Sequence, residues 1–352
     1  MSSNQFIIFE ELSGRSGNLG VITLNRQNAL NAINHQMIID MNKQLMEWET
    51  ADQIKAVVIH PAEGRAFCAG GDIRNAYEKA KDPNLSQFFR DEYLLNTRIH
   101  HYAKPYIAFL DGITMGGGVG ISIHGSHRVA TEKLTFAMPE TGIGFFPDVG
   151  ATYFLPRLPF KMGFYLGLTS ARISYNDCIA IGIANHCVAS DSYAKLIHAI
   201  ADAALFENPK AKISEVVDQF AVSYPPSKLL EHKEEIESCF SKTTIEEIIQ
   251  ALKNIGNEWC LQTVETLRTK SPTSLKVTLN ALLKGSKLSF DECMRMEYRL
   301  TCHFLQGKEF FEGIRAVVID KDQKPQWNPS QLKDVKEKEV EQYFAPLEKE
   351  LN

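Results

Sequence analysis

The sequence predicts an α/β protein in its first part and an almost entirely helical region after it. Short apolar runs of strand type alternate with helical patterns up to about residue 190, which is typical of a layered α/β structure. Beyond Asn208 and Pro209, apolar residues recur at helical spacing in one segment after another. We therefore place a soft boundary near 205–210 and expect two regions, 1–207 and 208–352.

Composition and charge are those of an ordinary globular protein. The 352 residues are 44% hydrophobic and 23% charged, and the net charge of -5 argues against nucleic acid as the main partner. The seven cysteines are scattered without a Cys-x-x-Cys pair, which predicts reduced thiols and no zinc site. No uncharged apolar run is long enough to span a bilayer, so we expect no membrane partner. The first residues show no signal or transit-peptide pattern, which predicts a cytoplasmic location.

The first strands and the first helix follow from local patterns. Residues 6–9 and 19–24 are predicted to be paired strands, with 13–18 as the turn between them. Residues 56–59 have the pattern of a buried strand. Asn34 is expected to open a helix with one apolar face, which consists of Met37, Ile38, Met41, Leu45 and Trp48.

Two glycine turns follow the next strand-like segments. Residues 65–74 contain a Gly-Gly-Asp turn that enters a helix, and the predicted strand 106–110 leads directly to the triplet Gly116–Gly118. Residues 116–124 are predicted to be helical despite their glycines. Glycine lets the backbone approach a ligand closely, and N–H groups at a helix start suit an anion. These turns therefore predict a site for an oxyanion.

Two carboxylates follow the second glycine turn in apolar loops interrupted by glycine. The short predicted strands 128–130 and 134–137 precede Glu140 and Asp148. A carboxylate beside an oxyanion site is a candidate nucleophile or general base. We therefore expect Glu140 and Asp148 to belong to the same site as the glycine turns.

Most of the remaining chain is predicted to be helical. The charge-rich tail at 331–350 is expected to be a solvated helix. The other predicted helices span 151–155, 162–168, 176–183, 192–205, 213–222, 244–255, 258–269, 273–284 and 289–305.

Two stretches resemble the crotonase (enoyl-CoA hydratase/isomerase) superfamily in their order and spacing: Phe67–Ile73 and Lys104–Gly118. The resemblance implies a crotonase-like spiral of ββα units and a substrate that is a thioester of coenzyme A. It also implies no separate cofactor and no metal. Further stretches are similar to the 3-hydroxyisobutyryl-CoA hydrolase branch of that superfamily, namely Met138–Ala151, Ser271–Lys276, Met296–Leu300 and Phe311–Asp322.

The resemblance assigns roles to backbone groups of the glycine turns. The thioester oxygen is expected to lie between the N–H groups of Gly71 and Gly117, and such donors can each contribute roughly 3 kcal/mol to a transition state. Ala69 is expected to bind substrate as well. Arg26 is a candidate for contact with the nucleotide end of coenzyme A, although an exposed loop arginine is an equal alternative.

One departure from the hydratases of the superfamily favours hydrolysis. Hydratases use two glutamates, and the first of these positions is Gly120 here, whereas the second is kept as Glu140. Asp148 stands where hydratases have glycine, and the hydrolase branch also uses a glutamate at the position of Glu92. The resulting hypothesis has Glu140 attack the thioester or act as general base on water. Glu92 and Asp148 would bind the acyl hydroxyl or position water.

Structural roles compete with several of these assignments. Asp148 could cap the helix predicted at Ala151, and Glu140 could be a carboxylate of a surface turn. Glu92 could be a charge on a helix surface. For Asp72 we expect capping of the following helix and orientation of the neighbouring amide rather than chemistry.

The sequence thus predicts an acyl-CoA thioester hydrolase that acts on 3-hydroxyisobutyryl-CoA, a step of valine breakdown. An enoyl-CoA hydratase or isomerase and a non-catalytic acyl-CoA binder remain as alternatives. 3-Hydroxypropionyl-CoA would be hard to reject, because one methylene is worth only ~1–3 kcal/mol in a pocket. Relatives of this superfamily often form trimers, so a homo-oligomer also stays open.

Overall fold

The computed structural model describes residues 6–78, 80, 82 and 84–351, and the chain divides into two compact units. Both units draw on separated parts of the chain, so they interleave along the sequence. The predicted division at 207/208 separates a core region from a helical region. It is a different division from that into the two compact units, and it stays a prediction. The first unit comprises Met1–Gly71, Leu94–Phe136 and Ile173–Lys228, and the second comprises Asp72–Tyr93, Ala137–Arg172 and Leu229–Asn352.

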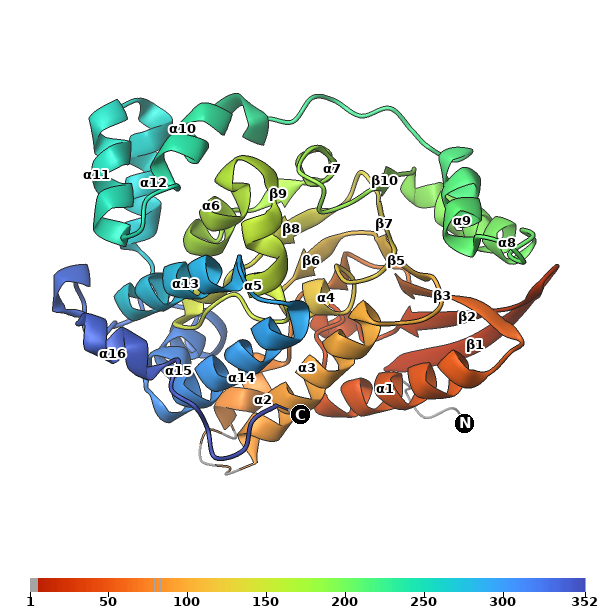
Figure 1. Cartoon of the computed structure of the whole chain (residues 1–352), viewed down its shortest axis with the longest axis horizontal. Coiled ribbons are helices and arrows are strands. Elements are labelled where there is room, and N and C mark those ends of the chain that lie inside the picture. Colours follow the sequence, from red (N-terminus) through yellow and green to blue (C-terminus); the bar gives the residue numbers. More distant parts are fainter. Residues whose placement is uncertain (1–5, 79, 81, 83, 352) are drawn as a thin grey trace. The chain divides into compact units, whose positions relative to one another are not determined.

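A six-stranded sheet forms the framework of the first unit (Figure 1). Its strand order is β1-β2-β3-β5-β7-β10. β1 and β2 are antiparallel, and every later pair of neighbours is parallel, as layered α/β structures require. The strands are β1 (Ile7–Gly14), β2 (Gly17–Leu24), β3 (Ile54–Pro61), β5 (Tyr106–Leu110), β7 (His127–Ala130) and β10 (His186–Cys187).

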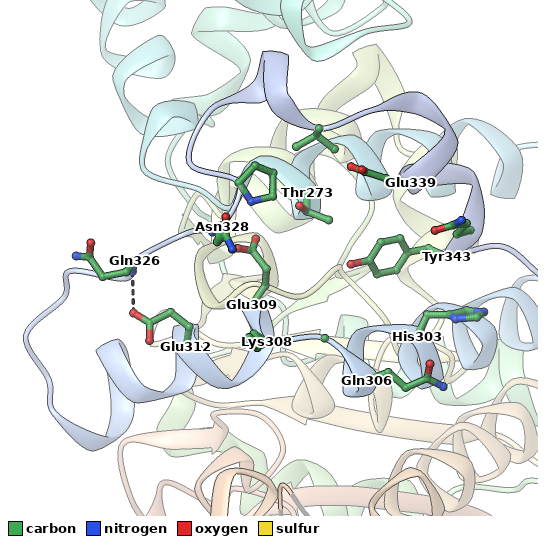
Figure 2. A pocket seen from close by; sticks show the side chains of 14 residues that line it. Thr273, His303, Gln306, Lys308, Glu309, Glu312, Gln326, Asn328, Glu339 and Tyr343 are labelled. Carbon is green, nitrogen blue, oxygen red and sulfur yellow. Dashed lines mark hydrogen bonds between the residues drawn. The ribbon is translucent and has the colours of Figure 1, made fainter.

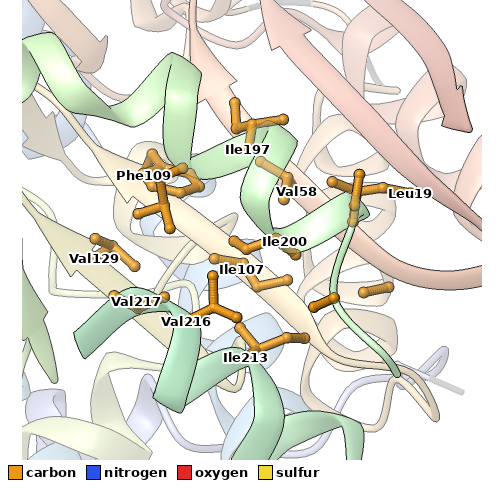
Figure 3. Close-up of a cluster of buried hydrophobic side chains, with 14 of the residues drawn as sticks. Leu19, Val58, Ile107, Phe109, Val129, Ile197, Ile200, Ile213, Val216 and Val217 are labelled. Carbon is orange, nitrogen blue, oxygen red and sulfur yellow. The ribbon is translucent and has the colours of Figure 1, made fainter. Parts of the chain in front are cut away.

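One face of this sheet is buried under α8 (Tyr193–Ala201) and α9 (Pro209–Asp218) (Figure 3). Alternate strand residues point to this face, because successive side chains of a strand point to opposite sides. Burial of each such side chain contributes roughly 1.5–3 kcal/mol. The cluster includes Val58, Ile107, Phe109 and Val129 from the strands, and Ile197, Ile200, Ile213, Val216 and Val217 from the helices.

The helix predicted after Asn34 is confirmed as α1 (His35–Thr50). The Asn34 side chain accepts a hydrogen bond from the N–H of Met37, which caps the helix. The predicted apolar face is the buried face, with Met37, Ile38, Met41, Leu45 and Trp48 as its buried residues.

A second sheet has the order β4-β6-β8-β9. β4 and β6 are parallel, whereas β8 and β9 are antiparallel. The helix predicted at 116–124 is much shorter, because α4 covers only Gly117–Gly120 and turns follow it. The strands are β4 (Ala66–Cys68), β6 (Ile113–Met115), β8 (Thr135–Ala137) and β9 (Ile173–Ser174), and α7 (Tyr175–Ala180) follows β9.

The second unit is mainly helical, and α3 (Leu85–His100) runs from this unit into the first. The predicted capping role of Asp72 is confirmed, because its carboxylate accepts from the N–H of Asn75 in α2. The helices predicted between 244 and 305 are confirmed to within two residues. The helices that lie entirely in the second unit are α2 (Ile73–Glu78), α5 (Ala151–Phe154), α6 (Met162–Thr169), α10 (Lys233–Cys239), α11 (Ile245–Ile255), α12 (Glu258–Arg268), α13 (Pro272–Gly285), α14 (Phe290–Gln306), α15 (Glu309–Ile314) and α16 (Glu337–Gln342).

The prediction of one solvated helix over 331–350 is wrong. Only α16 and a 3-10 turn at Leu332–Asp334 are helical there. Apolar side chains such as Val340 are buried, and Glu350 forms an ion pair of 2.8 Å with Arg299. The tail is therefore held by a few separate contacts, and its buried residues do not recur at helical spacing. None of the described helices is both long and apolar enough to cross a bilayer.

Candidate active site

The two glycine turns of the first unit follow neighbouring parallel strands. β4 is parallel to β6, and Cys68 lies opposite Thr114. The segments that follow these two strands therefore leave the sheet at the same edge. Gly70 has a φ of +122°, which disfavours other residues, and a Cβ there would lie 3.6 Å from the carbonyl oxygen of Met115. The turns at Gly70 and Gly116 consequently lie side by side.

The main-chain N–H groups of Gly71 and Gly117 are available to an acceptor. Gly117 is the first residue of α4, so its N–H has no carbonyl partner within the helix. Gly71 forms a β-bridge with Ile33, but the bond of this bridge runs from the N–H of Ile33 to the oxygen of Gly70 (2.9 Å). Neither N–H donates a hydrogen bond to any residue that the structure describes. Both groups suit the stabilisation of negative charge.

Ala69 and Arg26 lie around the first of these turns. The N–H of Ala69 donates to the carbonyl oxygen of Leu30 (3.0 Å), which holds the 26–33 loop against the turn. The guanidinium of Arg26 donates to the carbonyl oxygen of Ala32 (2.8 Å). Arg26 is therefore a half-buried loop residue that is anchored within its own loop, not a fully exposed one.

Four buried carboxylic acids come together in the second unit. Glu92, Glu140, Asp148 and Glu297 have exposed fractions of 2%, 5%, 5% and 0%. The other three all interact with the charge of Asp148, which places Asp148 in their midst. Burial is the largest cause that raises the pKa of every one of them.

Glu140 lies at the start of a 3-10 turn, Glu140–Ile143, three residues after β8. Its Oε2 atom is buried and has no hydrogen-bond partner among the described residues. Burial, followed by the charge of Asp148, raises the pKa of Glu140 well above its usual value. The alternative of a surface turn carboxylate is therefore wrong, and Glu140 has a free oxygen that can react or accept a proton.

Glu92 is a second carboxyl group with a free oxygen. It lies on α3, where its Oε1 atom is buried and unpartnered among the described residues. Burial and the charge of Asp148 raise its pKa well above the usual value. The alternative of a helix-surface charge is therefore wrong, and a buried acid of this kind can hold a polar group of a ligand.

Asp148 is bonded to a residue that sequence reasoning missed. The hydroxyl of Tyr93 donates to Oδ2 of Asp148 (2.7 Å) and lies 2.6 Å from Oγ1 of Thr301. Burial raises the pKa of Asp148 to about 7, and the hydrogen bond from Tyr93 opposes part of that rise. Tyr93 directly follows Glu92, so the pair of polar residues on a buried helix stretch was the available signal.

Glu297, not Asp148, caps the helix at Ala151. The Glu297 carboxylate accepts from the N–H of Gly150 (2.7 Å), the N–H of Thr152 (2.9 Å) and the hydroxyl of Thr152 (2.6 Å). Burial nevertheless raises the pKa of Glu297 to about 8. The turn that carries Asp148 is thus fastened to α14. Glu297 and Thr301 lie one helical turn apart on that helix, a spacing that could have indicated them.

A separate pocket of about 670 Å³ lies among the C-terminal elements of the second unit (Figure 2). Its carboxylates are engaged within the protein: Glu309 accepts from the N–H of Asn328 (2.7 Å), and Glu312 accepts from the N–H of Gln326 (2.7 Å). None of the predicted site residues lines this pocket. In the described part of the chain, no three His, Cys, Asp or Glu side chains are grouped to hold a metal ion.

Comparison with known proteins defines the class. Residues 19–344 match the family model described as enoyl-CoA hydratase/isomerase, and this chain belongs to that family. A human protein named 3-hydroxyisobutyryl-CoA hydrolase, mitochondrial, is 45% identical over 354 residues, which cover 99% of this chain and 91% of that protein. The protein of the same name from Xenopus tropicalis is 46% identical over 346 residues, covering 96% of this chain and 89% of that protein.

Solved structures confirm the predicted crotonase-like α/β fold with its helical C-terminal region. A carnitinyl-CoA dehydratase from Mycobacterium thermoresistibile superposes with a TM-score of 0.91 at 37% identity, over 99% of both chains. An enoyl-CoA hydratase from Rhodobacter sphaeroides superposes with a TM-score of 0.86 at 32% identity, over 97% of this chain and 98% of that one.

The predicted cytoplasmic location is wrong. The related hydrolases from human, Xenopus tropicalis and rat are all named mitochondrial proteins. The prediction was based on the lack of a leader-like pattern in the first residues, and the lack of such a pattern does not determine a compartment.

Proposed function

We propose that this chain hydrolyses the thioester bond of 3-hydroxyisobutyryl-CoA and releases 3-hydroxyisobutyrate and free CoA. The observation that carries the proposal is the buried Glu140 carboxyl group. It has an oxygen without a hydrogen-bond partner among the described residues, and the charge of Asp148 raises its pKa. The names of the related hydrolases, which match nearly the whole chain, support the same substrate. The reaction uses water and no separate cofactor, since coenzyme A is part of the substrate.

The proposed chemistry assigns one role to the backbone and another to Glu140. The N–H groups of Gly71 and Gly117 hold the thioester oxygen as it becomes negative, and each contributes roughly 3 kcal/mol to the transition state. Glu140 either attacks the thioester carbon to form a mixed anhydride or removes a proton from the attacking water. In both versions the C–S bond breaks, one water is consumed, and the departing thiolate takes a proton.

The remaining predicted residues bind and orient the substrate. Glu92 has a free buried oxygen that can accept the hydroxyl group of the acyl chain, and Asp148 positions that hydroxyl or the water. Ala69 and Arg26 flank the first glycine turn and contact the coenzyme A part. Single-turnover hydrolysis in oxygen-18 water identifies the anhydride version if label appears in Glu140, because general-base catalysis never bonds a water oxygen to this residue.

Hydration of an enoyl-CoA is the second candidate, because the two similar solved structures from Mycobacterium thermoresistibile and Rhodobacter sphaeroides are named a dehydratase and a hydratase. Gly120 argues against it. This residue lies in α4 at the position of the first hydratase glutamate, and it has no side chain that could hold water. A third possibility is an acyl-CoA binder without activity, which the unpartnered acid Glu140 disfavours.

A panel of acyl-CoA thioesters, with release of free thiol followed over time, tests the proposal. We expect 3-hydroxyisobutyryl-CoA to react fastest and 3-hydroxypropionyl-CoA to follow within roughly 200-fold, since the two differ by one methyl group. Loss of the crotonyl-CoA absorbance without thiol release would instead identify a hydratase. Tight binding of CoA with no turnover of any thioester would identify a binder.

A further inference from the structure

The hydroxyl group of Tyr93 lies between two oxygen atoms and can donate to only one of them. It is 2.7 Å from Oδ2 of Asp148 and 2.6 Å from Oγ1 of Thr301. An ionised carboxylate can only accept, whereas a threonine hydroxyl can donate or accept. When Asp148 is ionised, the Tyr93 hydrogen must therefore point to Asp148, and Thr301 must donate to Tyr93.

Besides the Tyr93 hydroxyl, only a hydrogen bond from its own backbone N–H lowers the pKa of Asp148, and no other side chain of the described residues donates to it. The ionisable groups that interact with it are Glu92 and Tyr93 from α3, Glu140 from the turn after β8, and Glu297 from α14. Three of these are acids, and no lysine or arginine of the described chain forms an ion pair with any of the four carboxyl groups. The Tyr93 hydroxyl is thus the side-chain donor that faces Asp148 in an acidic cluster.

We propose that Tyr93 is a positioning residue, which keeps Asp148 ionised and fixed in direction, and that Thr301 turns the Tyr93 hydrogen toward it. Because ionised Asp148 opposes a second negative charge nearby, this bond also decides which acid of the cluster ionises first. Asp148 loses its proton before Glu140, and Glu140 remains protonated to a higher pH. The catalytic consequence depends on the proposed hydrolase function, whereas the order of ionisation does not.

The direct test is the titration of the Asp148 carboxyl group, followed by carbon-13 NMR of protein labelled at aspartate side-chain carboxyl carbons. The signal is assigned by its disappearance in Asp148→Asn. The pKa of about 7 in the wild type should rise in Tyr93→Phe. Loss of a hydrogen bond to a charged group corresponds to a rise of roughly one to two pH units.

Three further variants isolate the role of the hydroxyl chain. Thr301→Val should raise the Asp148 pKa by a smaller amount, because the Tyr93 hydroxyl then loses the donor that orients and polarises it, and Thr301→Ser should restore the wild-type value. Tyr102→Phe is the matched control, since Tyr102 is also buried but donates to the carbonyl oxygen of Leu45 (2.9 Å) in the first unit. If Tyr93→Phe does not fold, the two Thr301 variants still decide the matter.

Activity provides a second, separate readout. We expect Tyr93→Phe to lose roughly tenfold in kcat at pH 7 with little change in KM, and to recover activity as the pH rises. An Asp148 titration that is unchanged in both Tyr93→Phe and Thr301→Val would overturn the proposal. If the wild type cleaves no thioester but the Asp148 pKa shifts as expected in the variants, the hydrolase function is refuted and the role of Tyr93 is retained.

Discussion

Gly118 lies so close to Cys68 that a Cβ atom on Gly118 would be 2.2 Å from the carbonyl oxygen of Cys68. Gly118 belongs to α4, and Cys68 is the last residue of β4. The contact therefore joins the two glycine turns of the first unit, and only glycine permits it. Any side chain at position 118 has to move the N–H of Gly117 relative to that of Gly71.

Gly118→Ala should strongly reduce thioester hydrolysis. The obstructing atom is main-chain oxygen, which cannot move aside as a flexible side chain would, so α4 must shift away from β4. We expect kcat/KM to fall by at least roughly 100-fold, the effect of losing one oxyanion donor. The unfolding free energy should fall by about 1–3 kcal/mol, measured by urea denaturation.

Gly64→Ala is the matched control for this variant. Gly64 is exposed, and the nearest atom to an added Cβ would be 3.7 Å away, which is an ordinary contact. Its activity and stability should equal those of the wild type. Comparable activity of Gly118→Ala and Gly64→Ala would show that the position of α4 is unimportant for the reaction.

The pH dependence of kcat/KM should have an acid limb that Asp148 controls. Burial and the charge of Asp148 both raise the pKa of Glu140, so activity should rise with pH as Glu140 loses its proton. Asp148→Asn removes one of these two causes, and the pKa of Glu140 then falls. The acid limb of the residual activity should therefore move to lower pH by about one unit.

The exposed Asp52 supplies the comparison for this experiment. Asp52→Asn should leave both the rate and the acid limb unchanged, because Asp52 belongs to the first unit and does not act on Glu140. A limb that stays in place in Asp148→Asn, or moves to higher pH, would contradict the electrostatic coupling of the two acids.

Glu297→Ala should lower both stability and activity. The variant leaves the N–H groups of Gly150 and Thr152 and the hydroxyl of Thr152 without their acceptor in a buried place. We expect the free energy of unfolding to fall by about 2–4 kcal/mol, and kcat to fall because the turn that carries Asp148 loosens. Chemical denaturation and thiol release measure the two effects.

This loss should depend on pH with a defined sign. The folded pKa of Glu297 is about 8, above its ordinary value of 4.5, so its folded form binds extra proton between these values. The stability that Glu297 contributes through its raised pKa is fully present below pH 4.5, and it is lost as the pH rises through about 8. The cost of Glu297→Ala should therefore be greater at about pH 5.5 than at about pH 8.5.

The exposed Glu341 on α16 provides the control, since Glu341→Ala should change stability by less than about 0.5 kcal/mol at either pH. Equal stability losses in Glu297→Ala and Glu341→Ala would show that the buried cap of the 150–152 turn contributes nothing.

Local signals were sufficient for much of the fold. The strand at Tyr106–Leu110 and the helix after Asn34 follow from apolar spacing and a capping side chain. The strand has the predicted bounds, and the helix begins directly after Asn34 with the predicted buried face. The glycine turns and Glu140 were visible as motifs, because glycine and acid residues in apolar loops are unusual without a function.

The partners of Asp148 could not be predicted, because they depend on contacts between distant parts of the chain. Tyr93 and Thr301 are separated by 208 residues, and Glu297 and Gly150 by 147. A local pattern assigns Asp148 to the helix beside it, whereas the tertiary structure brings Glu297 to that helix and Tyr93 to Asp148. The burial of Glu92 was equally invisible, since its environment is fixed by packing.

The most direct test of the proposed reaction is thiol release from 3-hydroxyisobutyryl-CoA by the wild type and by Glu140→Gln. The amide keeps the size of the side chain but can neither attack the thioester nor take a proton from water. We expect kcat to fall by at least roughly 100-fold, the scale of lost acid–base catalysis, while CoA binding and the melting temperature stay near those of the wild type. Near-normal turnover by a folded Glu140→Gln would contradict the role of Glu140 and with it the proposed mechanism.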